Sequence, residues 1–95
     1  MVMSLFSFPE DARWNPRSNA VEFTVAVGEY VGTVRVGRDV LRRLIAGPVA
    51  PDACLQAYHQ LRTELERAAE AKLRRRELAA DGNLDLTGRD LRPAR

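Results

Sequence analysis

Two side chains of this 95-residue sequence could form a nucleophile–base pair: Cys54, the single cysteine, and His59, the single histidine. A thiol becomes a strong catalytic nucleophile when a base lies within hydrogen-bonding reach. The two residues are five positions apart, which on a helix separates them by ~140° around the axis. They cannot share a proton there, so we expect Cys54 to be a small core residue and His59 to face solvent.

Other patterns that carry catalysis or ligand binding are not found in the sequence. A single cysteine excludes an intramolecular disulfide and leaves no cysteine pair for zinc. Thr63, a poor metal ligand, stands four residues after His59. The glycines at positions 28, 32 and 37 are spaced as hairpin residues and do not form a phosphate-binding loop. We therefore predict no catalytic residue, no cofactor and no metal, which is to say that the protein is not an enzyme.

The basic cluster of the sequence is the run from Arg74 to Arg76, with Arg67 and Lys72 just before it. Several guanidinium groups on one surface could bind nucleic-acid phosphates. However, Glu70 and Glu77 are interleaved with the cluster, and no aromatic residue accompanies it to stack on bases. Cations in the last turns of a helix also complement its dipole. We favour a solvated helix end and keep nucleic-acid binding as the alternative.

A second charged pair lies further upstream. Arg62 stands one helical turn after Tyr58 and one turn before Glu66, so it could bond both Glu66 and backbone carbonyls of a sheet. A boundary salt bridge of this i,i+4 kind contributes only about 0.2–0.5 kcal/mol. We favour that structural role over a binding role. The candidate interaction surface is then the set Arg62, Glu66, Lys72, Arg74, Arg75 and Arg76.

Hydrophobic periodicity gives the elements that must position these residues. Alternating apolar residues from 20 to 37, interrupted by Gly28-Glu29, predict a β-hairpin. We expect a strand and a polar loop over 1–19, a short helix over 38–46, a long helix over 51–80, a strand over 83–87 and a polar tail over 88–95. The predicted fold class is α+β: one domain with a small antiparallel sheet, the β-hairpin plus edge strands, packed against one short and one long α-helix.

The length of the second helix is unusual for a chain of this size. Nearly thirty residues at about 1.5 Å each give ~45 Å, whereas a compact domain of 95 residues has a radius of gyration of ~12–13 Å. Its inward-facing stripe also becomes charged at Lys72 and Arg76, which cannot be buried unpaired. The pattern therefore predicts that the helix overhangs the core or packs against a second copy of the protein.

The chain resembles a small bacterial family, domain of unknown function 1488. The likeness spans nearly the whole chain and is carried by Phe8-Pro9, Trp14-Asn15, Val21-Glu22-Phe23, Leu41, Tyr58, Arg62, Leu65-Glu66, Leu84, Leu86 and Asp90. The chain departs from the family pattern at Gly37, where a Ser or Thr cap would be usual, and at the run from Arg74 to Arg76. The resemblance implies a small α+β fold and assigns no activity.

The remaining predictions concern function and surroundings. We expect a non-enzymatic interaction or oligomerisation domain, with a homo-oligomer (a dimer) as the favoured partner state and another protein as a possible partner. Nucleic acid is the alternative, through the arginine-rich helix end. No segment approaches the ~20 apolar residues of a membrane span, and the start of the sequence does not read as a signal peptide. We therefore expect a cytoplasmic protein without membrane association.

Overall fold

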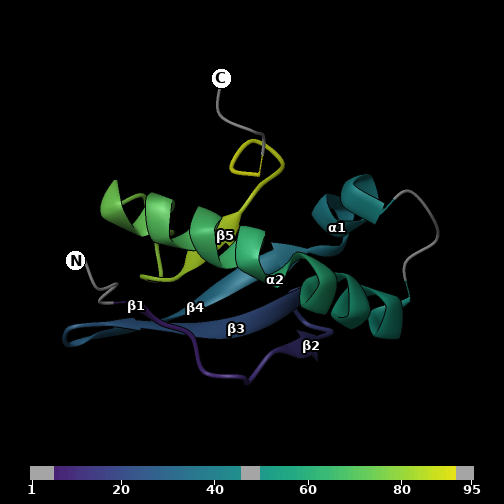
Figure 1. Ribbon diagram of the computed structural model, residues 1–95, viewed down its shortest axis with the longest axis horizontal. Coiled ribbons are helices and arrows are strands. Elements are labelled where there is room, and N and C mark those ends of the chain that lie inside the picture. Colours follow the sequence, from purple (N-terminus) through teal and green to yellow (C-terminus); the bar gives the residue numbers. More distant parts are fainter. Residues whose placement is uncertain (1–5, 46–49, 92–95) are drawn as a thin grey trace.

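The computed structural model describes residues 6–45 and 50–91, in which two helices lie on the same side of a five-stranded sheet (Figure 1). The elements follow one another in the order β1 (Phe6–Ser7), β2 (Arg13–Asn15), β3 (Ala20–Val27), β4 (Tyr30–Gly37), α1 (Arg38–Ile45), α2 (Pro51–Arg74) and β5 (Leu84–Leu86). The fold is therefore α+β, as predicted, with one short and one long helix.

The sheet is mixed, which corrects the expectation of a purely antiparallel sheet. Its strands run in the order β1-β3-β4-β5, and β2 also pairs with β3. β1, β2 and β4 are antiparallel to β3, whereas β5 is parallel to β4, with Val34 opposite Leu84 and Val36 opposite Leu86. The physical reason is that both helices lie between β4 and β5, and such a crossover returns the chain to start its next strand in the same direction.

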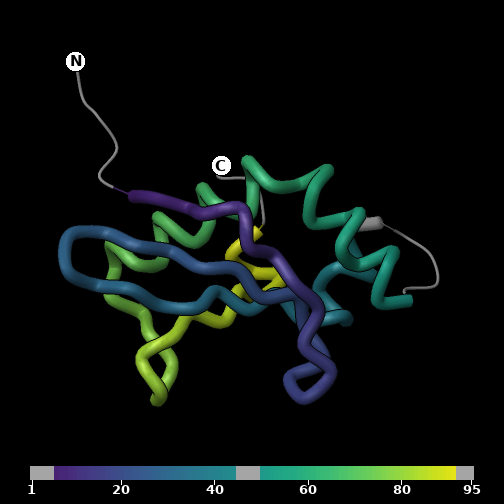
Figure 2. The backbone as a smooth tube through the Cα atoms, turned by 90° about the horizontal axis from the view of Figure 1, so that it is seen from below, coloured from purple at the N-terminus to yellow at the C-terminus, as the bar shows by residue number. Residues whose placement is uncertain are grey.

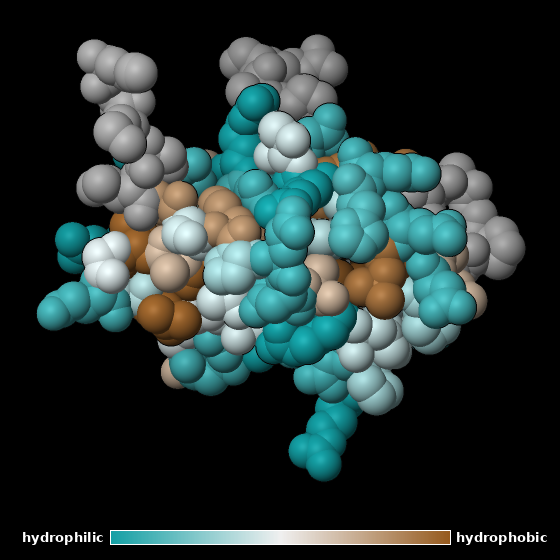
Figure 3. Space-filling model, turned by 60° about the horizontal axis from the view of Figure 1, so that its bottom comes forward, coloured by the Kyte–Doolittle hydropathy of each residue, from teal (hydrophilic) through white to brown (hydrophobic). Residues whose placement is uncertain are grey.

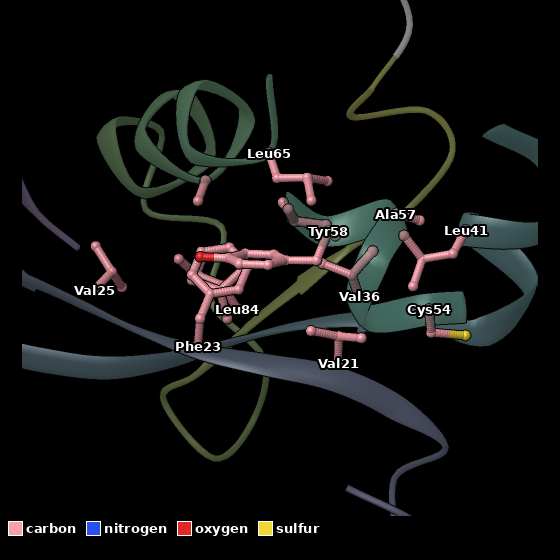
Figure 4. Close-up of a cluster of buried hydrophobic side chains, with 13 residues drawn as sticks. Val21, Phe23, Val25, Val36, Leu41, Cys54, Ala57, Tyr58, Leu65 and Leu84 are labelled. Atoms are coloured by element: carbon pink, nitrogen blue, oxygen red, sulfur yellow. The ribbon is translucent and has the colours of Figure 1, made fainter. Parts of the chain in front are cut away.

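The core lies between α2 and the helix-facing side of the sheet (Figure 4). The predicted alternation in β3 holds there, because Val21, Phe23 and Val25 are fully buried. On the opposite side Glu22 is buried too, although the alternation predicts an exposed residue. Its carboxylate accepts hydrogen bonds from Asn15 and Ser18, and these bonds offset the cost of burial.

Strand β2 lies inside the segment that the sequence predicted as a loop. Three residues are too few to show alternation, so the pairing of Trp14 with Val21 could not be predicted. Trp14 packs against the core. In α1, Leu41 is fully buried, whereas Leu44 is 42% exposed. Ala46, the last residue of the predicted short helix, lies outside the described residues.

Helix α2 ends at Arg74, six residues before the predicted end at position 80. Arg75 is the C-cap and Arg76 has a positive φ of 58°, which no helix can continue. The chain then turns so that Asp81 and Asn83 reach β4. The buried residues of α2 run from Cys54 to Ala69, and Leu73 near its end also packs against the core. The helix is therefore covered along nearly its whole length, and the predicted overhang is wrong.

The end of the described chain also differs from the polar tail expected over 88–95. Asp90 has a side chain that is only 8% exposed, and Leu91 packs against the core. Residues 92–95 lie outside the described part. Within residues 6–45 and 50–91, no helix is long and apolar enough to cross a membrane.

Candidate binding site

The two residues with the most obvious chemistry are far from forming a catalytic pair. Cys54 is fully buried, and burial raises the pKa of its thiol despite an opposing effect of the nearby Arg38 guanidinium. His59 is exposed and lies with its ring edge against Tyr58, the ring centres being 5.1 Å apart. Among the described residues, no group of three or more His, Cys, Asp or Glu side chains could hold a metal ion.

Arg62 and Glu66, two of the predicted interaction residues, hold the chain between β1 and β2 against α2. Arg62 donates to the Glu66 carboxylate at 2.7 Å, to Glu10 at 2.9 Å and to the backbone oxygen of Phe8 at 3.3 Å. Bonds to Glu66 and to a backbone carbonyl were both expected of this arginine. The contacts join segments more than fifty residues apart in sequence, which is a structural role.

Lys72 makes its contacts at the opposite edge of the sheet from Arg62, with β5 and the turn that follows it. Its Nζ donates to the backbone oxygen of Asp85 at 2.6 Å and to the Asp90 carboxylate at 2.9 Å. Burial raises the pKa of Asp90, but the hydrogen bonds from Lys72 and Thr87 outweigh it, so the pKa lies below its usual value. Lys72 is thus a partner inside the molecule and not the start of an overhang.

The arginine run at the end of α2 is partly neutralised by its neighbours. Arg74 bonds Glu70 at 2.9 Å and its guanidinium lies 5.2 Å from the ring centre of Phe6. Arg75 bonds Glu77 at 3.0 Å and lies 3.8 Å from Asp90. Arg76 is exposed at the residue that ends the helix. Of the six predicted residues, Arg62 and Arg74 thus contact the segment from Phe6 to Glu10, whereas Lys72 and Arg75 lie at Asp90.

A different charged row crosses the side of the sheet that faces away from the helices. Arg13 lies opposite Glu22, Glu22 opposite Arg35, and Arg35 opposite Asp85, so the charges alternate across four strands. Figure 3, which looks toward this lower side, shows hydrophilic side chains across the middle of the molecule. Arg35 is the best-held member, because it also bonds Asp81 at 2.8 Å and keeps the pKa of that carboxyl at about 2.

The charged row leads to a pocket of about 430 Å³ where β4 runs into α1. The first turn of α1 lines it, together with the turn before β3 and the end of β5; the lining residues are Ser18, Asn19, Ala20, Arg35, Gly37, Arg38, Asp39, Val40, Asp85 and Leu86. Gly37, directly before the helix, has no side chain to cap the free N–H groups of this turn. Asn19 has a positive φ of 55°, and its carbonyl accepts the Arg38 N–H at 3.0 Å.

Arg38 has no carboxylate partner in the described part of the chain. All thirteen Asp and Glu residues belong to that part, and none forms an ion pair with it. Its guanidinium lies 5.1 Å from the centre of the Trp14 ring and beside the Cys54 thiol, while its Nε is shielded from solvent without a hydrogen-bond partner among the described residues. An aromatic ring and a thiol therefore stand where a partly buried charge usually has a carboxylate.

Sequence reasoning missed this pocket, which we call the α1 corner. It is assembled from three segments that are distant in sequence: residues 18–20, 35–40 and 85–86. These segments meet only because β5 pairs with β4, in parallel direction, and does not take another place in the sheet. One sequence signal pointed here without being used, namely Gly37 at the position where a Ser or Thr cap would be usual.

Comparison with known proteins gives a family and a fold. The model of the family described as Protein of unknown function (DUF1488) matches residues 6–86. A crystal structure of a protein of unknown function from this family, from Shewanella loihica PV-4, is similar with a TM-score of 0.83 and 22% sequence identity, covering 90% of this chain and 96% of that one. No curated protein matches.

Proposed function

We propose that this chain, which belongs to the DUF1488 family of proteins of unknown function, is a non-enzymatic binding domain whose partner engages the α1 corner. The observation that supports the proposal is the pocket itself. Its volume of about 430 Å³ falls within the ~300–1,000 Å³ usual for binding sites. Its lining combines the first turn of α1, the charged side chains of Arg38 and Asp39, and the apolar residues Val40 and Leu86, which is a set suited to recognition.

The lining chemistry favours binding over catalysis. Neither a histidine nor a cysteine is among the residues that line the pocket. The Ser18 hydroxyl donates to Glu22 at 2.9 Å, and Asp85 and Asp39 are engaged by Arg35 and Arg42. A nucleophile needs a base in hydrogen-bond reach. Ser18 has the Glu22 carboxylate there, but that carboxylate also accepts from Asn15 and lies 3.6 Å from Arg13, so we interpret the contact as structural. We therefore propose that no covalent chemistry takes place at this site.

The substitution Gly37→Leu tests the proposal with little risk to the fold. A Cβ on Gly37 would meet nothing within 4 Å, and its backbone is outside the left-handed region, so the added side chain can enter the pocket without strain. Thr63→Leu, on the exposed side of α2, is the matched control for added hydrophobicity. The affinity-tagged full chain and both variants would be expressed in the native host, and retained proteins identified by mass spectrometry.

We expect a partner that is retained by the wild type and by Thr63→Leu but lost by Gly37→Leu. Circular dichroism and thermal unfolding of all three proteins should agree, which shows that the loss is local. Retention of the same partner by Gly37→Leu would refute the α1 corner as the binding site.

A second copy of the chain is the other candidate partner. The part of β4 that β5 leaves uncovered supports this candidate. β5 pairs only with Val34 to Val36, and Val31, which lies beyond that pairing, is 68% exposed. An exposed strand edge can pair with another chain. Light scattering at ~100 μM, far above a μM dissociation constant, tests this candidate. If a second copy is the partner, the wild type will be a dimer and Val31→Lys will be a monomer. A monomeric wild type would exclude the second copy as a partner.

Nucleic-acid binding through the end of α2 has less support. Arg74 and Arg75 are engaged by Glu70 and Glu77, so much of the charge of that cluster is already compensated. We keep the α1 corner as the proposed site.

A further inference from the structure

The arginines of the described chain divide into those with a carboxylate partner and those without. Arg13, Arg35, Arg42, Arg62, Arg74 and Arg75 each form an ion pair. No described carboxylate pairs with the others, which are Arg17, Arg38, Arg43, Arg67, Arg76 and Arg89. Two of this second group belong to α1: Arg38 lines the α1 corner, and Arg43 lies further along the same helix.

Arg43 of α1 reaches the turn that follows β5. One of its guanidinium nitrogens lies 3.6 Å from the position that a Cβ on Gly88 would occupy, and Arg89 follows Gly88 in the chain. The acidic groups nearby are already used, since Asp81 and Asp85 bond Arg35 and Asp39 bonds Arg42. The charged residues that line the pocket balance, because Arg35 and Arg38 stand against Asp39 and Asp85. Helix α1 itself carries Arg38, Arg42 and Arg43 against the single carboxylate of Asp39, so the positive charge that a partner would meet lies on this helix.

We infer that the partner bound at the α1 corner presents an acidic protein segment, a run of Asp or Glu side chains. The inference rests on the binding role proposed above and names the chemical class of the partner. Guanidinium groups bind carboxylates through paired N–H donors. The uncapped first turn of α1 adds N–H groups and the positive end of a helix dipole, both of which favour an anion.

A protein segment fits this corner better than a nucleic acid does. Single-stranded nucleic acids are bound by stacking their bases on exposed aromatic rings. The aromatic residue near this corner is Trp14, and the Arg38 guanidinium already covers its ring. The corner offers apolar surface instead: Leu44 is 42% exposed on α1, and Val40 and Leu86 form a wall of the pocket. A mixed acidic and apolar peptide can use both features.

Titration of the full-length chain with a fluorescein-labelled octaglutamate peptide tests this class of partner. Peptide anisotropy gives the affinity, and the fluorescence of Trp14, the single tryptophan, reports on the corner through its contact with Arg38. We expect binding that weakens as salt is raised, because the contacts are between exposed charges. Arg43→Glu and Arg89→Glu should each lower the affinity about threefold to tenfold, since an exposed charge pair is weak but reversal adds repulsion.

Arg67→Glu is the matched control, because it makes the same charge change on an exposed position of α2. It should lower the affinity clearly less than the corner variants do. Absence of peptide binding, or an equal loss with Arg67→Glu, would overturn the acidic-segment inference. The inference would also be overturned if a single-stranded RNA of equal charge bound more tightly than the peptide and its affinity responded to the same substitutions. In each of those cases, the affinity-tag experiment with Gly37→Leu still tests separately whether the α1 corner is a binding site.

Discussion

Lys72 shows how a single residue can mislead when only its sequence position is known. On the helical wheel it occupies the buried stripe, and an unpaired ammonium group there would have to leave the core. The structure supplies what the sequence could not show, a partner 18 residues later: Asp90, whose side chain is 8% exposed. Because Asp90 stands in a segment without a regular pattern, nothing in the sequence joins the two residues.

Replacing Lys72 with Met should lower the free energy of unfolding by about 1–3 kcal/mol. The value is below the ~3–5 kcal/mol cost of breaking a fully buried pair, because Lys72 is 14% exposed and Asp90 keeps its bonds from Thr87. Urea unfolding at pH 7 measures it. Arg74→Met removes an exposed pair and should cost less than ~1 kcal/mol. Equal losses in the two variants would contradict this account of Lys72.

The same pair predicts a dependence on pH. The pKa of Asp90 is lower in the folded protein than its usual value of 3.8, so its contribution to stability is complete above that value and is lost as pH falls through the folded pKa. The advantage of the wild type over Lys72→Met should therefore shrink below about pH 4. An advantage that stays constant down to pH 2 would contradict it.

At the scale of the elements, the strands with clear alternation could be predicted and the short ones could not. The hairpin of β3 and β4 lies where the apolar alternation placed it, with Gly28 at a positive φ of 57° in its turn. Gly32 lies inside β4, where a glycine indicates a bulge or a close approach of another group. The register is regular, with Val25 opposite Gly32, and the close neighbour is the Tyr30 side chain, which crosses Gly32 to donate to the Gly82 carbonyl at 2.8 Å.

Gly32→Ala should therefore destabilise the protein by about 1–2 kcal/mol, the cost of losing a partly buried hydrogen bond. A Cβ at position 32 collides with the Tyr30 hydroxyl, which would have to leave Gly82. Thermal or urea unfolding of Gly32→Ala, Tyr30→Leu and the double variant checks the coupling. In the Tyr30→Leu background, the alanine should cost clearly less. An unchanged cost there would mean that the backbone at Gly32 is responsible and not Tyr30.

For the whole molecule, the layers and overall size follow from the sequence, whereas the site does not. The radius of gyration is 12.9 Å, as expected for a compact chain of this length. Figure 2 shows how β5 comes to lie near the end of β4 and α1, although it is distant from them in the chain. The α1 corner depends on that assembly, and in particular on β5 running parallel to β4. Local patterns carry no information about this long-range pairing. The sequence therefore predicted an interaction surface at the arginine run that ends α2, because that run can be recognised from the sequence alone.

The central claim is that the α1 corner is the surface used for binding, and amide hydrogen exchange tests it most directly. Exchange of the full chain would be followed by mass spectrometry, alone and with the captured partner. We predict that the partner slows exchange over residues 18–20, 35–40 and 85–86, which build the corner, and leaves the exposed side of α2 unchanged. Protection confined to α2 and β1, with the corner exchanging as in the free chain, would contradict the account.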